Sequence, residues 1–155
     1  LIMINKKVQL LIENYLSENE KIFLVSLNFS SSNHIEVLID SFSGINISDC
    51  ITLNRYIENG LNRDEEDFSL KVSSAGLTEP FKVFKQYEKN IGKKVKVQLN
   101  NGNVLKGKMV GADSKKGLLL EIKKREKIGK QKLVIKESLN INFKEISKTS
   151  IILSF

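Results

Sequence analysis

Few side chains in this 155-residue chain could carry out chemistry, and those few are scattered. The single cysteine, Cys50, and the single histidine, His34, lie far apart in sequence, and a thiol needs a neighbouring base to act as a nucleophile. We therefore expect Cys50 to be a buried core thiol and His34 a surface side chain. The acidic run Asp64–Asp67 lacks the glycine-punctuated spacing of a calcium loop, which favours a solvated loop over a cation site.

The remaining inventory also argues against an enzyme. Ser73 and Ser74 form a small polar pair, but no residue near them in sequence can act as a base. Residues 83–155 contain no histidine, no cysteine and one aspartate, Asp113. That half therefore offers no metal-ligand cluster, no general acid–base pair and no phosphate-cradling GxxxxGK[ST] loop. We predict a protein without catalytic residues, metal or cofactor.

The charge of the chain is divided unevenly. Residues 1–82 carry 7 Lys/Arg and 12 Asp/Glu, a net charge of −5, whereas residues 83–155 carry 18 and 6, a net charge of +12. Lysines can simply keep a small domain soluble. An excess this large favours binding to a polyanion, and a phosphate backbone is the commonest one in a cytosol.

The expected compartment is the cytoplasm. One cysteine excludes an internal disulfide framework and suits a reducing environment. No apolar run approaches the roughly 18 residues needed to cross a bilayer, so we expect no membrane association.

Hydrophobic periodicity predicts an α-β-β-α-β order for the first half. Helical spacing covers 8–16 and 50–61, with Ser48 as the expected N-cap of the second helix. Alternation predicts strands at 22–28, with Phe23, Val25 and Leu27 on one side, and further strands at 35–40 and 67–73. Two helices should cover one face of a small mixed sheet.

The second half reads as five short strands. A short helix is expected within 81–90, and Asn100-Asn101-Gly102 is a strong hairpin turn. Strands are expected at 93–99, 104–111, 118–122, 133–135 and 151–155, with a basic loop at 123–132 and a helical turn at 143–146. Five such strands with tight turns predict a small closed barrel.

The two halves meet in the stretch Asp67–Pro80, DFSLKVSSAGLTEP, which opens as a strand and ends in small residues before the chain's one proline. We therefore expect an α/β domain over 1–80, a linker with a short helix over 81–92 and a basic barrel over 93–155. We expect five residues to set the orientation of the barrel relative to the first domain: Ser73, Ser74, Gly76, Leu77 and Pro80.

The run DFSLKVSSAGLTEPF resembles the signature of the RimP family of bacterial ribosome maturation factors, usually of the form EVSSPGLDRPL. The segments GKKVKVQLNNGNVLKGKMVGAD and INFKEISKTSIILSF also look like that family, so the resemblance covers nearly the whole chain in order. The chain departs from the pattern where Ala75 stands in place of a common proline and where Thr78-Glu79 replaces an acidic–basic pair.

The resemblance implies an α+β fold, with an α/β N-terminal domain followed by an SH3-like barrel of the Sm type. It implies a monomeric, non-enzymatic partner of the immature 30S small ribosomal subunit that assists late assembly. The implied contacts are 16S rRNA and a small-subunit ribosomal protein near the decoding region.

We expect RNA phosphates to be neutralised by a set of basic side chains in the second half, without base reading, because the basic stretch has no interleaved aromatics. These residues are Lys106, Lys108, Lys115, Lys116, Lys123, Lys124, Arg125, Lys127, Lys130 and Lys132. A stand-alone Sm-like RNA-binding protein, acting as a ring, is the alternative. A small enzyme with an unrecognised site is the weakest third class.

Overall fold

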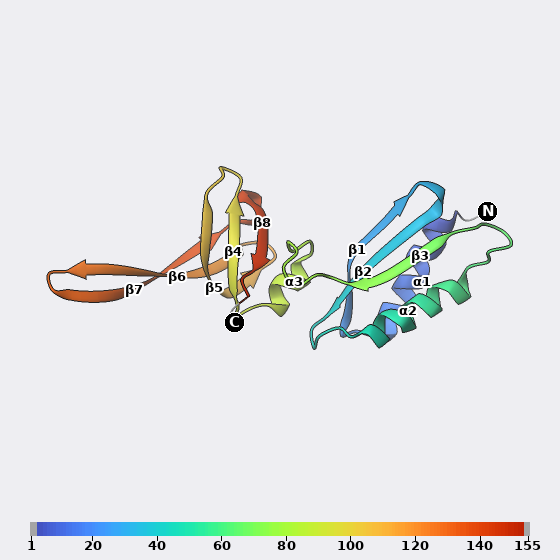
Figure 1. Ribbon diagram of the computed structural model, residues 1–155, viewed down its shortest axis with the longest axis horizontal. Helices are drawn as coiled ribbons and strands as arrows, with labels where there is room; N and C mark the ends of the chain where they lie inside the picture. Colours follow the sequence, from blue (N-terminus) through green and yellow to red (C-terminus); the bar gives the residue numbers. More distant parts are fainter. Residues whose placement is uncertain (1–2, 154–155) are drawn as a thin grey trace. The chain divides into compact units, whose positions relative to one another are not determined.

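The computed structural model describes residues 3–153, and the chain divides into two compact units between Ala75 and Gly76. The fold is a mixed α+β fold, as expected (Figure 1). The first unit contains α1 (Ile4–Glu18), β1 (Ile22–Ser30), the 3₁₀ turn η1 (Ser31–Asn33), β2 (His34–Ser41), α2 (Ile47–Gly60) and β3 (Ser69–Ser74). The second contains α3 (Phe84–Lys89), β4 (Lys94–Leu99), β5 (Val104–Asp113), β6 (Gly117–Ile128), β7 (Gln131–Ile141), the 3₁₀ turn η2 (Phe143–Glu145) and β8 (Ile146–Ile151). Within residues 3–153 no helix is both long and apolar enough to cross a bilayer.

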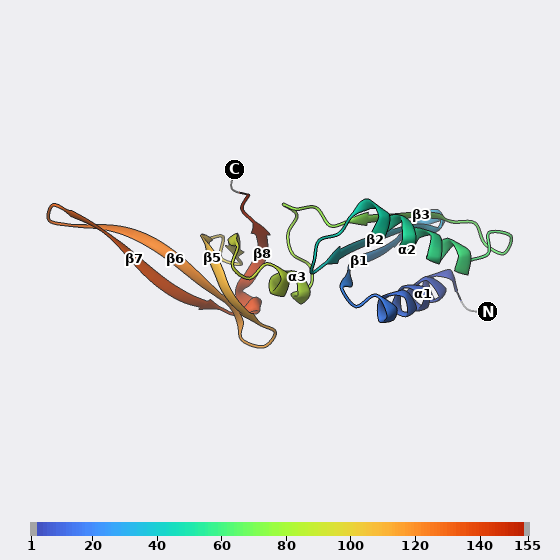
Figure 2. The same ribbon diagram turned by 90° about the horizontal axis from the view of Figure 1, so that it is seen from below.

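The first unit has the predicted α-β-β-α-β order. Its sheet runs β1-β2-β3, antiparallel between β1 and β2 and parallel between β2 and β3. Both helices contribute to one core against the sheet (Figure 2). The fully buried members of that core are Val8, Ile35, Val37, Ile39, Leu53 and Ile57. Burial of this many aliphatic side chains is the dominant favourable term in the stability of the unit.

A β-bulge in β1 changes which residues share a face. The register passes from Leu24 opposite Ile39 to Ser26 opposite Leu38, so Val25 is the extra residue. Leu24 and Leu27 then belong to one packed cluster, although strict alternation separates them. The predicted grouping of Phe23, Val25 and Leu27 on one side is therefore wrong, because a bulge resets the two-residue period.

The N-cap of α2 is Asn46, two residues earlier than the predicted Ser48. The Asp49 N–H donates to Asn46 Oδ1 at 2.9 Å, and the Asn46 N–H donates to Asp49 Oδ2 at 3.1 Å. This reciprocal pair satisfies two backbone donors at the start of the helix. Ser48 lies inside the first turn and donates to the same Asn46 oxygen at 2.6 Å.

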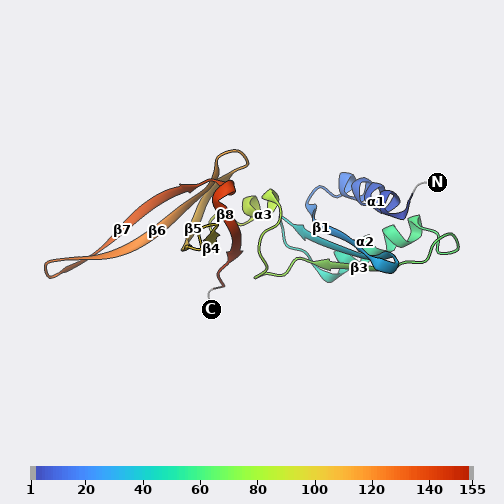
Figure 3. The same ribbon diagram turned by 90° about the horizontal axis from the view of Figure 1, so that it is seen from above.

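The second unit contains one antiparallel sheet in the order β7-β6-β5-β4-β8 (Figure 3). One face is the core, in which Val95, Val97, Met109, Leu118 and Leu120 are fully buried. Across residues 3–153 no ladder joins the outer strands β7 and β8. The predicted closure of the sheet into a barrel is therefore absent from the hydrogen-bonded pairing of the described strands.

The predicted basic loop over 123–132 is instead a β-ribbon. Strands β6 and β7 pair without interruption from Leu118–Ile141 to Ile128–Gln131, and Gly129, with φ +62°, lies in the turn. Strand β5 pairs with β6 only as far as Glu121, so residues 122–137 form a two-stranded extension, which we call the ribbon. Figure 1 shows it reaching beyond the other strands of its sheet. The loop prediction was wrong because backbone pairing organises this polar stretch, which has no alternating apolar pattern.

The bounds of the last strand also differ from the prediction. The last strand is Ile146–Ile151 and not 151–155, because β8 pairs with β4 from Ile146 opposite Leu99 to Ile151 opposite Val95. Residues 154–155 of the predicted strand lie outside the described residues. The short helix expected within 81–90 is confirmed as α3, which belongs to the second unit. Just before it, the Phe81 N–H donates to the Thr149 carbonyl at 2.7 Å. The predicted helical turn before the last strand is confirmed as η2.

A hydrogen bond between two hydroxyl groups joins α3 to β8, and its loss should be measurable. Tyr87 donates to Thr149 Oγ1 at 2.9 Å, and Thr149 is fully buried. Tyr87→Phe should lower the free energy of unfolding of the second unit by about 1–2 kcal/mol, because a buried acceptor loses its donor. Urea unfolding followed by signals from the second unit checks this, and an unchanged midpoint would contradict it.

The same tyrosine makes the second unit sensitive to alkaline pH. Burial raises the pKa of Tyr87, an effect partly offset by its hydrogen bond to Thr149. The folded state therefore keeps this proton to a higher pH than the unfolded state, whose pKa is about 10. Its stabilising contribution is complete below that value and is lost as pH rises through the folded pKa. Phenylalanine at this position should remove that part of the alkaline destabilisation.

Candidate nucleic-acid interface

The register of the second sheet gathers positive charge on the face opposite its core. Directly opposite residues of paired strands point to the same face, so the ladders assign each side chain to one side. We call one set of exposed side chains the basic face. It consists of Lys94, Lys96, Lys106, Lys108, Lys123, Arg125, Lys127, Lys132, Lys136 and Lys148. Among the described strands one carboxylate shares this face, Glu121, which lies 4.0 Å from Lys136 Nζ.

Four pairs on the basic face place lysine directly opposite lysine. They are Lys94–Lys108, Lys96–Lys106, Lys123–Lys136 and Lys127–Lys132. Like charges at directly opposite positions destabilise a sheet, whereas opposite charges there stabilise it. The arrangement therefore works against folding stability, and a bound polyanion would relieve it.

The structure divides the ten predicted binding residues among three locations. Six lie on the basic face: Lys106, Lys108, Lys123, Arg125, Lys127 and Lys132. Three lie in turns, Lys115 and Lys116 before β6 and Lys130 at the tip of the ribbon. The backbone N–H groups of Lys115 and Lys116 donate to Asp113 Oδ1 at 2.9 and 3.0 Å, which fixes that turn. These hydrogen bonds also lower the pKa of Asp113.

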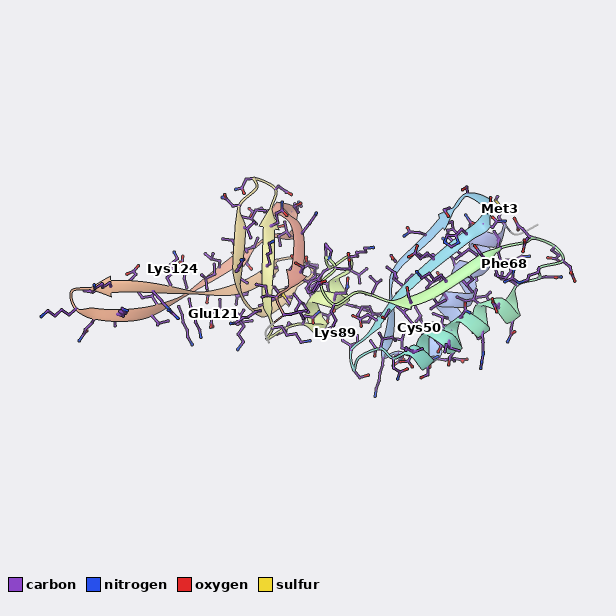
Figure 4. All side chains as sticks on the ribbon, in the orientation of Figure 1. Met3, Cys50, Phe68, Lys89, Glu121 and Lys124 are labelled. Atoms are coloured by element: carbon purple, nitrogen blue, oxygen red, sulfur yellow. The ribbon has the colours of Figure 1, made fainter. Side chains whose placement is uncertain are left out.

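Lys124 lies on the opposite face of the ribbon from the six. Its Nζ is 2.7 Å from Glu137 Oε2, and this contact raises the pKa of the Lys124 ammonium. Figure 4 labels Lys124 on the ribbon and Glu121 closer to the rest of the sheet. Since its charge is already matched and points away from the basic face, Lys124 is separated geometrically from the other predicted residues.

Four members of the basic face are absent from the predicted set: Lys94, Lys96, Lys136 and Lys148. The outward alternation of Lys94 and Lys96 is visible in the sequence, and the same pattern selects Lys106 and Lys108. Lys136 and Lys148 depend on the true extents of β7 and β8, which the sequence prediction placed too narrowly or too late.

The motif residues form the end of a strand and a turn. Ser73 and Ser74 end β3, and the Glu79 N–H donates to the Gly76 carbonyl at 3.2 Å. Leu77 is 73% exposed. Pro80 follows directly after this turn.

The first unit contains a pair of side chains whose types could act in catalysis, but the pair lacks a group to orient it. His34 Nδ1 lies 2.6 Å from Ser69 Oγ, a contact that parallel pairing creates and the sequence does not reveal. Both side chains are exposed on neighbouring strands, and among the described residues no carboxylate contacts the imidazole to orient it. The pair therefore lacks the third group of a catalytic triad.

Cys50 is buried as predicted, and both burial and the neighbouring Asp49 charge raise the pKa of its thiol, which keeps it neutral and unreactive.

Acidic side chains of the loop Asp64–Asp67 form ion pairs. Lys7 pairs with Glu65 and Arg63 pairs with Asp67, each at 3.3 Å. Across the described chain, no group of three ligating side chains could hold a metal ion.

Comparison with known proteins gives matches to one family. Residues 11–78 match the model of the RimP N-terminal domain. A protein of Christiangramia forsetii named "Ribosome maturation factor RimP" is 36% identical over 155 residues, covering 99% of this chain and 100% of that protein. Proteins with the same name from Flavobacterium psychrophilum and Porphyromonas gingivalis are 35% identical over 152 residues and 40% identical over 100 residues. The match to the Flavobacterium psychrophilum protein covers 97% of this chain and 97% of that protein. The match to the Porphyromonas gingivalis protein covers 64% of this chain and 65% of that protein.

Proposed function

Because this chain belongs to the RimP family, we propose that it is a ribosome maturation factor that binds the immature 30S small ribosomal subunit and assists its late assembly. The observation that carries the proposal is the basic face with its four lysine–lysine pairs across neighbouring strands. A face that costs stability in the free protein is best accounted for by a ligand that neutralises it. Ribosomal RNA is the polyanion that the relatives' name points to.

The basic face would act by neutralising phosphates. Each lysine placed on a phosphate releases condensed counterions, which supplies affinity without sequence selection. Contacts of this kind position a protein on RNA, while base edges carry the sequence information. The protein would favour the productive conformation of the precursor because it binds that state more tightly than the competing ones.

The other partner would be a basic protein. Residues 1–82 have a net charge of −5, which complements a basic ribosomal protein near the decoding region, while 16S rRNA takes the basic face. The protein would work as a cytoplasmic monomer without cofactor. The neutral thiol of Cys50 and the unoriented His34–Ser69 pair support a role without catalysis.

The second unit would be an open form of the SH3-like, Sm-type barrel. Its first four strands pair in sequence, and its fifth, β8, returns to pair with the first, β4, after the turn η2. The order supports this assignment, with the β7 and β8 edges left unjoined. Residues 1–80 would serve as the α/β domain and 93–155 as the barrel. Residues 81–92 would link them as a segment that packs against the barrel through α3.

Binding to small subunits should weaken steeply with salt. If at least six cations of the basic face contact phosphates, affinity should fall by about 10³-fold or more between 50 and 200 mM salt. Sedimentation of the protein with purified immature small subunits across that range measures the slope. An affinity that stays flat would contradict phosphate neutralisation.

Sedimentation of a lysate tests the assembly role itself. The protein should travel with free small subunits, and its deletion should accumulate immature ones. Neither effect would be seen if the protein were a stand-alone Sm-like ring on small RNAs. Such a ring would also elute as a hexamer or heptamer on sizing, whereas the proposed factor would elute as a monomer.

A further inference from the structure

Four aromatic side chains gather beside β8 in the second unit, although the sequence spreads them from residue 81 to 143. Phe81 meets Tyr87 with ring centroids 4.9 Å apart, and Tyr87 meets Phe143 at 4.9 Å. Phe143 in turn meets Phe84 at 6.0 Å. All three contacts are edge-on, one of the geometries that aromatic pairs prefer. Phe81 and Phe84 are the ends of this chain of rings, so each has one ring neighbour within it.

These rings line a cavity of about 240 Å³. For comparison, an engineered apolar cavity of about 150 Å³ is large enough to bind benzene. Two lysines, Lys82 and Lys148, also line the cavity. The site therefore combines aromatic walls with cationic side chains, which is the combination that single-stranded nucleic acid binds.

The walls are fixed before any ligand arrives. The Tyr87 hydroxyl donates to buried Thr149, and the Phe81 N–H donates to the carbonyl of the same residue. Gln86 is 5% exposed, and its Oε1 accepts hydrogen bonds from the N–H groups of Lys82 and Val83 at 2.6 and 3.1 Å. A preorganised wall loses little conformational freedom on binding.

Lys148 links the cavity to the basic face. It lies opposite Gln98 on the face that carries Lys96, and it also lines the aromatic cavity. An RNA strand whose phosphates follow the basic face would therefore pass the mouth of the cavity. We propose that this cavity takes one unstacked nucleobase of single-stranded RNA, with Phe81 and Phe84 as stacking walls and Lys82 and Lys148 beside the flanking phosphates. This inference rests on the proposed function and adds to it a preference for single strands.

The test compares a short single-stranded RNA with a duplex of the same length, by fluorescence anisotropy on the full chain. Phe84→Leu keeps the apolar volume but removes the ring, so it should weaken single-strand binding about 5- to 150-fold, the range for one stacked base. Duplex binding should stay unchanged, because a duplex offers no free base. Phe84→Tyr keeps a ring and should restore single-strand binding.

Phe42→Leu is the matched control. Phe42 is a partly exposed phenylalanine of the first unit whose ring lies 5.1 Å from that of Phe23, and its replacement should alter neither affinity. Photocrosslinking of the unaltered protein to an RNA that contains 5-iodouridine should label peptides with Phe81, Phe84 or Phe143. This measurement does not depend on the folding of any variant.

The proposal is overturned if Phe84→Leu leaves single-strand binding intact, which is the result expected of a cavity that takes a protein side chain. It is also overturned if single-strand and duplex binding fall equally, or if crosslinks appear only elsewhere. Failure of the proposed function looks different. In that case Lys106→Glu would leave duplex binding unchanged and no small-subunit association would be found, whatever happens at Phe84.

Discussion

Lys106→Glu should stabilise the second unit and at the same time weaken its binding to RNA. The new carboxylate would face Lys96 across the β4–β5 ladder and replace a repulsive pair with an attractive one. Such an exchange should raise the free energy of unfolding by about 0.5–1 kcal/mol. Binding should fall about tenfold, and the dependence of log affinity on log salt should lose about one unit of slope, because one phosphate contact is gone.

The ribbon offers a second position where a lysine lies directly opposite another lysine. Lys127→Glu would face Lys132. Because Lys127 lies six residues beyond Glu121, the last residue of β6 that pairs with β5, its effect should be nearly additive with that of Lys106→Glu. The double variant should therefore bind about a hundredfold more weakly than the unaltered protein. Urea unfolding and anisotropy with a duplex RNA measure the two quantities on the same samples.

Lys124→Glu is the control with the same change of net charge. It would set a carboxylate against Glu137 on the opposite face of the ribbon, so it should lower stability and leave RNA affinity within about twofold. If Lys106→Glu and Lys124→Glu weakened binding equally, net charge and not the basic face would govern affinity.

Gly117→Ala should unfold the second unit under mild conditions. Gly117 begins β6 with φ +103°, a conformation that side chains rarely adopt. A Cβ there would also collide with the carbonyl oxygen of Ile141 and lie 2.8 Å from the Cα of Asn142. Both obstacles are backbone, so we expect a loss of about 3 kcal/mol or more in the free energy of unfolding of this unit.

Gly129→Ala separates the cost of a positive φ from the cost of the collision between the added Cβ and the backbone. Gly129 also has a positive φ, but a Cβ there would have no neighbour within 4 Å, so the cost should be about 1 kcal/mol. Thermal unfolding followed by resolved NMR signals from each unit gives both values, and the first unit should be unaffected. Equal losses for the two variants would show that close contact at Gly117 has no part in the effect.

Local signals predicted most of the elements of this fold. The Asn100-Asn101-Gly102 turn is present because glycine supplies the positive φ that a tight hairpin needs, and Gly102 has φ +90°. The elements that were missed depend on partners distant in sequence. Residues 123–128 show no alternation of apolar and polar residues, yet they pair with β7. A bulge such as Val25 leaves no mark in the composition.

The sequence shows that the second half is rich in lysine, but it does not show which lysines share one face of the sheet. Counting lysines points to the half of the chain that carries the basic face. It could not show that Lys94 lies opposite Lys108 or that Lys124 lies on the opposite face with Glu137, because register sets both relations. The aromatic cavity was missed because tertiary packing, and no local pattern, brings its rings together. Its rings come from α3, η2 and the segment before α3, and none interrupts the basic stretch.

The ribbon has a consequence for how long a complex lasts. Residues 122–137 have no third strand beside them in the described chain, and an isolated two-stranded segment is marginally stable in water. The free energy needed to hold such an arm straight on RNA is subtracted from what its contacts supply. We therefore expect such an arm to dissociate sooner than a rigid sheet with the same charges, which is compatible with transient binding to an assembly intermediate.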